Sequence, residues 1–364
     1  MSTLTYKCPG CDGPLSFDAA TQHWSCKFCG GSFALEELQK QHKDDTQNVQ
    51  DVQNDTAKEP ASGQQQPEKE PAFFEDGTLY TCPSCAAQVL TDNNTAATFC
   101  SFCHNPTIIS ERLTGVLQPE KVIPFSIDKK GALELLGKYC KKKPLIPKDF
   151  SSDTQLEKIS GIYVPFWLFD ADTLGQMTAS CSNVTHWTSG GYRYTKTDKY
   201  KVERAGTAQF ALMPADASKA LDDDMMNKLE PYDMSGMVDF SMSYLSGFLA
   251  EKYDLTSDEV FERVEERTFK ATEDLIRKTM SGYTNVNVGF KDFKTTKKLP
   301  HYALLPVWML TYKYRGKIHL FAANAQTGKV VGNLPVSKKR AFAWFSAACA
   351  VVTGLWFVIS LFLV

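Results

Sequence analysis

Two copies of one cysteine pattern constrain the fold of this chain more than any other feature of its sequence. The copies are Cys8-x2-Cys11-x14-Cys26-x2-Cys29 and Cys82-x2-Cys85-x14-Cys100-x2-Cys103, which together use eight of the eleven cysteines. Each CxxC turn can aim two thiolates at one point, and a second turn brought back by a short hairpin completes a tetrahedron around a metal ion. The pattern therefore predicts two zinc ribbons, each with one structural Zn²⁺ ion.

The residues around these cysteines support a metal site. Pro9 and Pro83 follow the first cysteine of each copy, and Gly30 follows Cys29, as expected for tight turns. His104 replaces that glycine in the second copy. The alternatives are disulfides or a rubredoxin-like iron site, which uses the same four thiolates. Four thiolates leave no position for water or substrate, so we expect structural rather than catalytic metal ions.

The composition of the chain is that of an ordinary globular protein. Its 364 residues suggest two or three domains, and its formal net charge of −2 gives no basic excess that would point to nucleic acid. The first twenty or so residues lack the apolar region of a secretory signal, so we expect the N-terminus to stay in the compartment where it is made. Thiols that are ready to bind metal fit a reducing cytosol.

The C-terminal residues 341–364 carry no charged side chain and are long enough to cross a bilayer as a helix. Lys338, Lys339 and Arg340 precede them, so the positive-inside rule places the N-terminal bulk in the cytoplasm. The alternative is a buried soluble helix. We expect a transmembrane helix, and hence a tail-anchored, single-pass protein of the cell membrane.

The chain divides into five predicted segments. These are ribbon 1 at residues 1–34, a disordered linker at 35–77, ribbon 2 at 78–112, a duplicated domain at 115–336 and the transmembrane helix at 341–364. The tract from Lys40 to Pro71 has almost no aliphatic side chains and cannot repay the entropy of ordering. We therefore expect the two ribbons to move independently, as separate binding heads.

The duplication is predicted from two similar segments at residues 161–169 and 301–310, which contain Pro165-Phe-Trp167 and Pro306-Val-Trp308. A glycine turn and a second strand follow each, and the later copy predicts a three-stranded meander. A helical stretch precedes each strand pair, the first at residues 131–143. The fold class predicted for the chain is thus α+β.

The second helix is predicted to begin after Thr256, which forms a capping box with Glu259. Apolar or small side chains follow at helical spacing and should form its buried face. They are Phe261, Val264, Thr268, Ala271 and Leu275.

No common catalytic motif occurs in the sequence, and we expect no catalytic residue and no enzyme. His186 and His319 could be ligands or bases, but no partner lies near them in the sequence, and we expect structural or surface roles. Cys181 is expected to be a small core residue rather than a nucleophile, and Cys140 and Cys349 are unpaired.

Charge decides between nucleic acid and protein as the partner of the ribbons. Residues 78–109 contain no lysine or arginine, and ribbon 1 has only Lys7 and Lys27, offset by Asp12 and Asp18. Neither ribbon has the basic footprint that phosphate contacts require. We therefore expect protein partners and consider nucleic acid unfavoured.

Two further contacts are suggested by the sequence. Basic residues gather at residues 129–143 and 291–298, where they could contact anionic lipid headgroups or form ordinary solvated faces. A stripe of small side chains in the C-terminal helix could support a homo-oligomer. It consists of Ala343, Ala347, Ala350 and Gly354.

The order of these parts, with the paired Pro-x-Trp segments and Gln326-Thr-Gly, resembles the bacterial TFIIB-type zinc ribbon-containing membrane proteins of the YdjG-like family. The resemblance implies a membrane partner of a phage-shock-protein-A-type scaffold in envelope stress. We expect a non-enzymatic, membrane-anchored adaptor that binds or recruits cytoplasmic proteins at the inner leaflet. The alternative is a membrane-tethered nucleic-acid-binding factor.

Overall fold

The computed structural model describes residues 3–38, 78–113, 118–147, 158–314, 317–332 and 336–362, apart from positions 83, 86, 102, 104 and 144. These residues form two compact units. The first, which we call the ribbon unit, comprises Met1–Val164, Asp224–Lys252 and Leu304–Val364. The second, the hairpin unit, comprises Pro165–Asp223 and Tyr253–Ala303. Most of the expected linker, and His104, lie outside the described residues.

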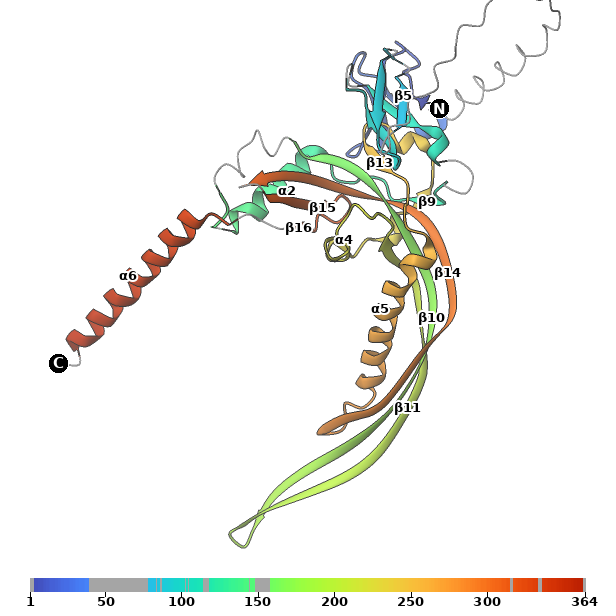
Figure 1. Ribbon diagram of the computed structural model, residues 1–364. Coiled ribbons are helices and arrows are strands. Elements are labelled where there is room, and N and C mark those ends of the chain that lie inside the picture. Colours follow the sequence, from blue (N-terminus) through green and yellow to red (C-terminus); the bar gives the residue numbers. More distant parts are fainter. Residues whose placement is uncertain are drawn as a thin grey trace, which may run out of the picture. The chain divides into compact units, whose positions relative to one another are not determined.

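Strands dominate the described residues (Figure 1). Three strands are much longer than the others: β10 (Ser160–Ser189), β11 (Tyr192–Asp216) and β14 (Asn285–Tyr314). The remaining strands are β1 (Thr3–Leu4), β2 (Leu15–Asp18), β3 (His23–Cys26), β4 (Ser32–Phe33), β5 (Thr78–Thr81), β6 (Gln88–Thr91), β7 (Thr95–Phe99), β8 (Pro106–Ile109), β9 (Lys121–Val122), β12 (Val238–Asp239), β13 (Leu249–Glu251), β15 (Lys317–Asn324) and β16 (Val330–Gly332).

One mixed sheet of 11 strands has the order β1-β8-β7-β13-β10-β14-β15-β16, with β11 added to β10 and with β9 paired to β12 and β14. The expected α+β class was wrong, because the described residues are mostly sheet. The physical reason is that the two Pro-x-Trp segments belong to 30-residue strands rather than to short strand pairs. The expected meander is present as β14-β15-β16, and all its pairs are antiparallel.

The core of the ribbon unit is aromatic. The ring of Phe125 stacks on Phe248 with centroids 3.9 Å apart, and it meets Tyr163 and Trp308 edge-on at 5.0 and 5.2 Å. All four side chains are buried. They come from four distant parts of the chain, so burial of these rings fixes the connections between them.

The hairpin unit is built on one long antiparallel ribbon of β10 and β11, which runs from the Phe166–Asp216 pair to the Ser189–Tyr192 pair (Figure 1). Gly190 and Gly191 form its turn, with φ angles of 59° and 82°. Two residues with positive φ match the twist of the flanking strands, and glycine adopts that conformation without a steric cost. A glycine turn and a second strand were expected after residues 161–169, but not a hairpin of this length.

The α-helices are α2 (Lys129–Lys141), α4 (Asp223–Leu229), α5 (Ser257–Lys278) and α6 (Lys338–Phe362). The predicted capping box of α5 is present, because the Thr256 side chain accepts from the Glu259 N–H and Glu259 accepts from the Thr256 N–H. The buried face of α5 agrees with the prediction at Val264 and Thr268, and at its other three positions it is displaced by one residue. It consists of Val260, Val264, Thr268, Thr272 and Ile276, whereas Leu275 is 50% exposed.

Two threonines explain that shift. Thr268 donates its hydroxyl to the Glu265 carbonyl at 2.9 Å, and Thr272 donates to the Thr268 carbonyl at 2.7 Å. Because these hydroxyls are satisfied within the helix, threonine can face the core without an unpaired polar group.

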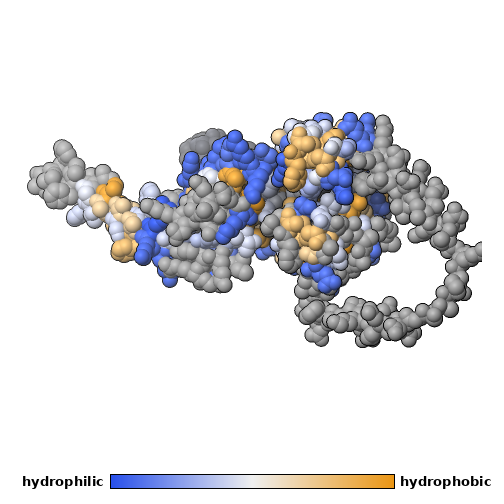
Figure 2. Space-filling model, turned by 90° about the horizontal axis from the view of Figure 1, so that it is seen from above, coloured by the Kyte–Doolittle hydropathy of each residue, from blue (hydrophilic) through white to orange (hydrophobic). Residues whose placement is uncertain are grey.

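Helix α6 begins at Lys338, so the three basic residues form its first turn instead of preceding it. Within the described residues, no helix is long and apolar enough to cross a membrane. The predicted transmembrane helix at 341–364 was therefore wrong, and with it the tail-anchored, single-pass localisation. Figure 2 shows orange, hydrophobic side chains on the described stretch of α6.

Candidate metal centres

The first four-cysteine group lies at the two turns of ribbon 1. The turn after Cys8 is closed by hydrogen bonds from the Cys8 N–H to the Gly13 carbonyl at 2.7 Å and from the Asp12 N–H to the Cys8 carbonyl at 2.9 Å. The turn after Cys26 repeats this arrangement with Gly31 and Gly30, both at 2.9 Å. Asp12 and Gly30 occupy matching positions with φ angles of 57° and 74°. The two CxxC segments therefore form two similar turns that face each other.

The sulfur atoms of this group have the spacing of a tetrahedral metal site. The Sγ atoms of Cys8 and Cys29 are 3.5 Å apart, as are those of Cys11 and Cys26. All four lie within 4.8 Å of one another. A Zn²⁺ ion about 2.3 Å from each of four sulfurs would separate neighbouring sulfurs by about 3.8 Å. The group could thus hold one metal ion.

The second group repeats this geometry in ribbon 2. The Sγ atoms of Cys82 and Cys103 are 3.7 Å apart, and those of Cys85 and Cys100 are also 3.7 Å apart. The N–H groups of Cys82 and Cys100 donate to the carbonyls of Ala87 and Asn105 at 2.9 and 3.0 Å. This group could also hold one metal ion. All eleven cysteines are free thiols, so the disulfide alternative does not describe the structure.

The pKa values of two thiols in ribbon 1 are shifted in opposite directions. The backbone N–H of Cys29 is the main cause that lowers the pKa of Cys26 to about 6. For Cys11, the backbone N–H of Gly13 lowers the pKa, but hydrogen bonds with Cys26 and Cys29 outweigh it and raise the pKa to about 12. Several thiolates so close together repel one another, and a bound cation would relieve that repulsion.

Two glycines leave room for the first group. A Cβ atom on Gly13 would lie 2.8 Å from the Phe28 ring and 3.4 Å from the Sγ atoms of Cys11 and Cys26. A Cβ atom on Gly31 would lie 2.9 Å from the Phe33 ring. The sulfur cluster is therefore enclosed by backbone that only glycine can supply without displacement of a ring.

Ribbon 1 is anchored to the rest of the ribbon unit through Trp24. Its indole N–H donates to the Ser243 carbonyl at 2.7 Å, and its ring lies 5.3 Å from that of Tyr244. The Phe17 N–H donates to the Ser246 carbonyl at 2.8 Å. Phe28 of this ribbon is 74% exposed. A distant segment of the chain thus completes the core of ribbon 1.

The two ribbons are also joined to each other. Strand β1 pairs antiparallel with β8, in register Thr3–Ile109 and Leu4–Ile108. The Thr5 hydroxyl adds a hydrogen bond of 3.1 Å to the Pro106 carbonyl. The ribbons are therefore parts of one unit, and the expectation that they move independently was wrong.

A groove of about 470 Å³ lies beside the ribbons, within the ribbon unit. Ribbon 1 contributes Phe17 and ribbon 2 contributes Phe99, while Phe248 and Trp308 come from the core. Its polar lining includes two acidic and two basic side chains, namely Asp18, Asp128, Lys27 and Lys129. Sequence analysis missed this site because its residues share no local motif.

The other residues singled out in the sequence have mostly structural surroundings. His186 is exposed on β10, where its Nδ1 lies 2.8 Å from the Thr195 hydroxyl, and His319 lies on β15 in the other unit. Cys181 belongs to the buried cluster of the hairpin unit with Met177 and Ile276, as expected. Burial raises the pKa of Cys140 to about 11.

The two basic segments differ in their surroundings. Lysines of the first lie on α2 and just after it, and they are exposed. In the second, Lys291 pairs with Glu273 at 2.9 Å and Lys298 pairs with Asp258 at 2.5 Å. Two of its four lysines therefore already have carboxylate partners on α5.

Comparison with known proteins gives one extensive similarity. The chain is 38% identical over 343 residues to an uncharacterized protein, YdjG, of Bacillus subtilis (strain 168). The match covers 94% of this chain and 93% of the relative. No family model matches the chain, and no solved structure matches it. The similarity thus extends over nearly the whole length of both proteins.

Proposed function

The chain belongs to the YdjG-like family, and from this premise we propose that it is a non-enzymatic adaptor that binds a protein segment in the groove beside its ribbons. We also propose Zn²⁺ as the metal of both sites, because small closed sites of four thiolates are typical of structural zinc. The metal ions would then act by holding the ribbon residues of the groove in place.

The groove is the observation that carries this proposal. Its volume of about 470 Å³ is within the usual range of binding pockets, and its lining combines aromatic rings with a few polar groups. Phe99 is 38% exposed at the groove. Such a surface suits an apolar side chain of a bound peptide.

Charge supports a protein partner over nucleic acid. Lys27 and Lys129 in the groove lining are balanced by Asp18 and Asp128. A phosphate backbone would meet as many negative as positive side chains there, which removes the electrostatic gain that drives nucleic-acid binding. A peptide with mixed charges would find complementary groups for both signs.

The resemblance to the family implies a phage-shock-protein-A-type scaffold as the first partner to test. The purified full-length chain, loaded with zinc, is titrated with such a scaffold. Replacement of Phe99 with alanine should weaken binding by about tenfold, which corresponds to ~1.4 kcal/mol. Phe290→Ala removes an equally large exposed ring from the hairpin unit and should leave binding unchanged.

Two outcomes would contradict the proposal. Equal binding by the wild type and the Phe99 variant would separate the interaction from the groove. Salt-dependent binding of single-stranded or duplex oligonucleotides in the same titration, together with no scaffold binding, would favour the nucleic-acid alternative.

A further inference from the structure

The outer part of the β10/β11 ribbon, residues 184–201, has surroundings unlike the rest of the hairpin unit; we call it the hairpin tip. Closer to its base, the ribbon packs against the C-terminal end of α5. Its Met177, Ala179, Cys181 and Val202 side chains form one buried cluster with Ile276 and Met280. None of residues 182–201 is buried. The ribbon therefore continues beyond the core that stabilises its base.

The hairpin tip exposes an aromatic stripe on one face. Trp187 pairs across the ribbon with Tyr194, and their rings stack with centroids 5.4 Å apart and an interplanar angle of 12°. Tyr192 lies two positions before Tyr194, so it points to the same face, and it is 72% exposed. Trp187 is 47% exposed. Large exposed aromatic side chains on a segment that packs against no buried cluster usually mark a binding surface.

The charges of the hairpin tip are ordered along the ribbon. Residues 184–192, which include the turn, carry no lysine, arginine or carboxylate. Four cations follow on β11, at Arg193, Lys196, Lys199 and Lys201. Lys196 and Lys201 each approach one carboxylate at 3.0 Å, those of Asp198 and Glu203. The end of the ribbon is thus uncharged and aromatic, and the cations begin behind it.

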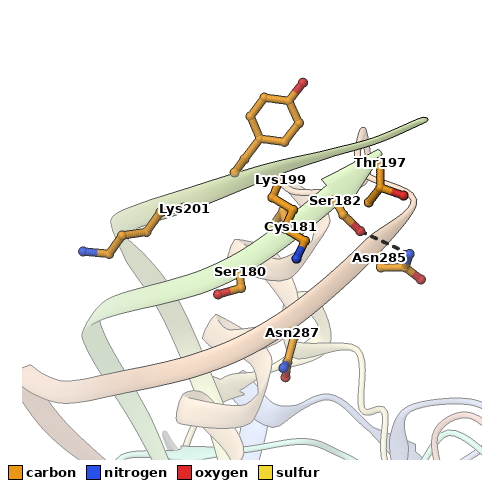
Figure 3. A pocket seen from close by; sticks show the side chains of 9 residues that line it. Ser180, Cys181, Ser182, Thr197, Lys199, Lys201, Asn285 and Asn287 are labelled. Atoms are coloured by element: carbon orange, nitrogen blue, oxygen red, sulfur yellow. Dashed lines mark hydrogen bonds between the residues drawn. The ribbon is translucent and has the colours of Figure 1, made fainter. Parts of the chain in front are cut away.

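A shallow polar groove of about 550 Å³ lies farther from the turn, where residues 197–201 of β11 form part of its lining (Figure 3). Besides Cys181 and Tyr200, its lining consists of hydroxyl, amide and ammonium groups and includes no carboxylate. They are Ser180, Ser182, Thr197, Lys199, Lys201, Asn285 and Asn287. These are groups that donate hydrogen bonds to phosphate oxygens.

We propose that the hairpin tip binds the surface of an anionic lipid bilayer. Trp187, Tyr192 and Tyr194 would lie at the boundary between headgroups and acyl chains, where tryptophan and tyrosine are favoured. At ~3.3 Å per residue, Arg193 follows Gly191 by about 7 Å, which is within the headgroup layer. Lys196 follows by about 17 Å, which places it roughly 10 Å outside the headgroup layer, or about one Debye length from the surface charge. This contact lies on the surface and involves no spanning segment.

The same observations disfavour the two other occupants. Nucleic-acid binding stacks bases on free ring faces, but Trp187 and Tyr194 cover one face of each other. A second copy would add its β11 to this edge, since β11 pairs only with β10 among the described strands. Four like charges along that edge would then repel their counterparts.

The test uses the full-length, metal-loaded chain and two kinds of vesicle, phosphatidylcholine alone and phosphatidylcholine with phosphatidylglycerol. The wild type should co-sediment with the anionic vesicles and less with the neutral ones. The double variants Trp187→Ser/Tyr192→Ser and Arg193→Gln/Lys196→Gln should each reduce anionic binding at least about fivefold. Lys294→Gln/Lys297→Gln removes the same charge from exposed positions of the same unit and should have no such effect.

A second measurement locates the contact. Brominated lipids should quench part of the tryptophan emission of the wild type, and that part should disappear in Trp187→Phe, which retains an aromatic ring. The proposal is overturned if the quenching is the same in both proteins, or if the control variant loses as much binding as the tip variants. Displacement of the vesicles by a single-stranded oligonucleotide that binds the tip would also overturn it, in favour of nucleic acid. The groove beside the ribbons lies in the other unit, so scaffold binding should persist in every tip variant.

Discussion

Trp167 and Trp308 make the same hydrogen bond in different units: each donates its indole N–H to the carbonyl one residue before a helix N-cap. Trp167 donates to Leu255 at 2.9 Å, next to Thr256 at the start of α5. Trp308 donates to Ile127 at 2.9 Å, next to the N-cap of α2. A tryptophan on a strand thus fixes the point at which a helix begins.

The correspondence extends to the backbone. The Ala217 N–H donates to the Pro165 carbonyl at 2.9 Å, and the Ala325 N–H donates to the Pro306 carbonyl at 3.1 Å. The carbonyls of Ala217 and Ala325 then accept from Leu255 and Ile127, respectively. Sequence analysis assigned each Pro-x-Trp strand to the helix before it. The hydrogen bonds instead join Trp167 to the later helix and Trp308 to the earlier one.

Loss of either indole hydrogen bond should destabilise the chain. Trp167→Phe and Trp308→Phe each leave a largely enclosed carbonyl without its donor, and each should lower the free energy of unfolding by about 1–3 kcal/mol. Trp187→Phe changes an exposed ring and should alter it by less than about 0.5 kcal/mol. Thermal unfolding of the three variants measures this. Equal effects for all three would show that the hydrogen bonds do not fix the helix starts.

Metal loss from ribbon 1 should also destabilise the distant segment around Ser243, to which the ribbon is hydrogen-bonded. Cys26→Ser should reduce bound zinc from two ions per chain to one, measured by metal analysis of the purified protein. Because Trp24 and Phe17 bind the carbonyls of Ser243 and Ser246, amide exchange in that distant segment should also rise. Cys349→Ser, at an exposed position of α6, should change neither quantity. Unchanged exchange near Ser243 would argue against the anchoring role of Trp24.

A methyl group near the sulfur atoms should weaken metal binding. Gly13→Ala places its Cβ 2.8 Å from the Phe28 ring and 3.4 Å from two sulfurs, so the ring or the turn must shift. We expect at least about tenfold weaker zinc binding in a chelator competition, in line with other changes next to metal ligands. Gly10→Ala is the matched control, because its Cβ would have an ordinary contact of 3.9 Å with the Cys8 sulfur. The same affinity in both variants would contradict the enclosure argument.

The stability of the hairpin unit should fall as the pH rises through the range of Asp216. Burial raises the pKa of this carboxyl from 3.8 to about 6, although Arg263 at 3.3 Å opposes the shift. The folded state therefore holds the proton more tightly than the unfolded state, whose pKa is about 3.9. This contribution is fully present below about pH 4 and is lost by about pH 6, with an upper size of roughly 3 kcal/mol.

Asp216→Asn tests this dependence, since the amide resembles the protonated acid in shape. The difference in free energy of unfolding between the variant and the wild type should be least favourable to the variant at pH 4. At pH 7 this difference should have shifted in favour of the variant. Asp274→Asn, at an exposed position of α5, should show no such crossover. Unfolding by denaturant at both pH values provides the measurement, and a constant difference between wild type and Asp216→Asn would refute the assignment.

Local patterns were the predictable part of this protein. The cysteine spacing located both four-cysteine groups, and Thr256 with Glu259 located the start of α5, because each depends on residues close together in the sequence. The anchoring of Trp24 on Ser243 joins residues 219 positions apart, and no local pattern reports such a contact.

The length of the hairpin was not predicted, for a related reason. Its outer strands carry threonines, lysines and tyrosines without a buried apolar alternation, so the periodicity that normally predicts strands is weak there. The face of α5 was misplaced because Phe261 and Leu275 are more hydrophobic than the threonines that the sheet actually buries. For α6, the uncharged sequence alone predicted more than the described helix supports.

The pairing of β1 with β8 means that the spacing of the two ribbons does not depend on the length of chain between them. The hydrogen bonds between these two strands fix that spacing. The entropy of loop closure grows with the logarithm of length, so doubling the loop would cost only about 0.6 kcal/mol. The segment between the ribbons is therefore free to gain or lose residues during evolution while the two metal centres keep their relative position.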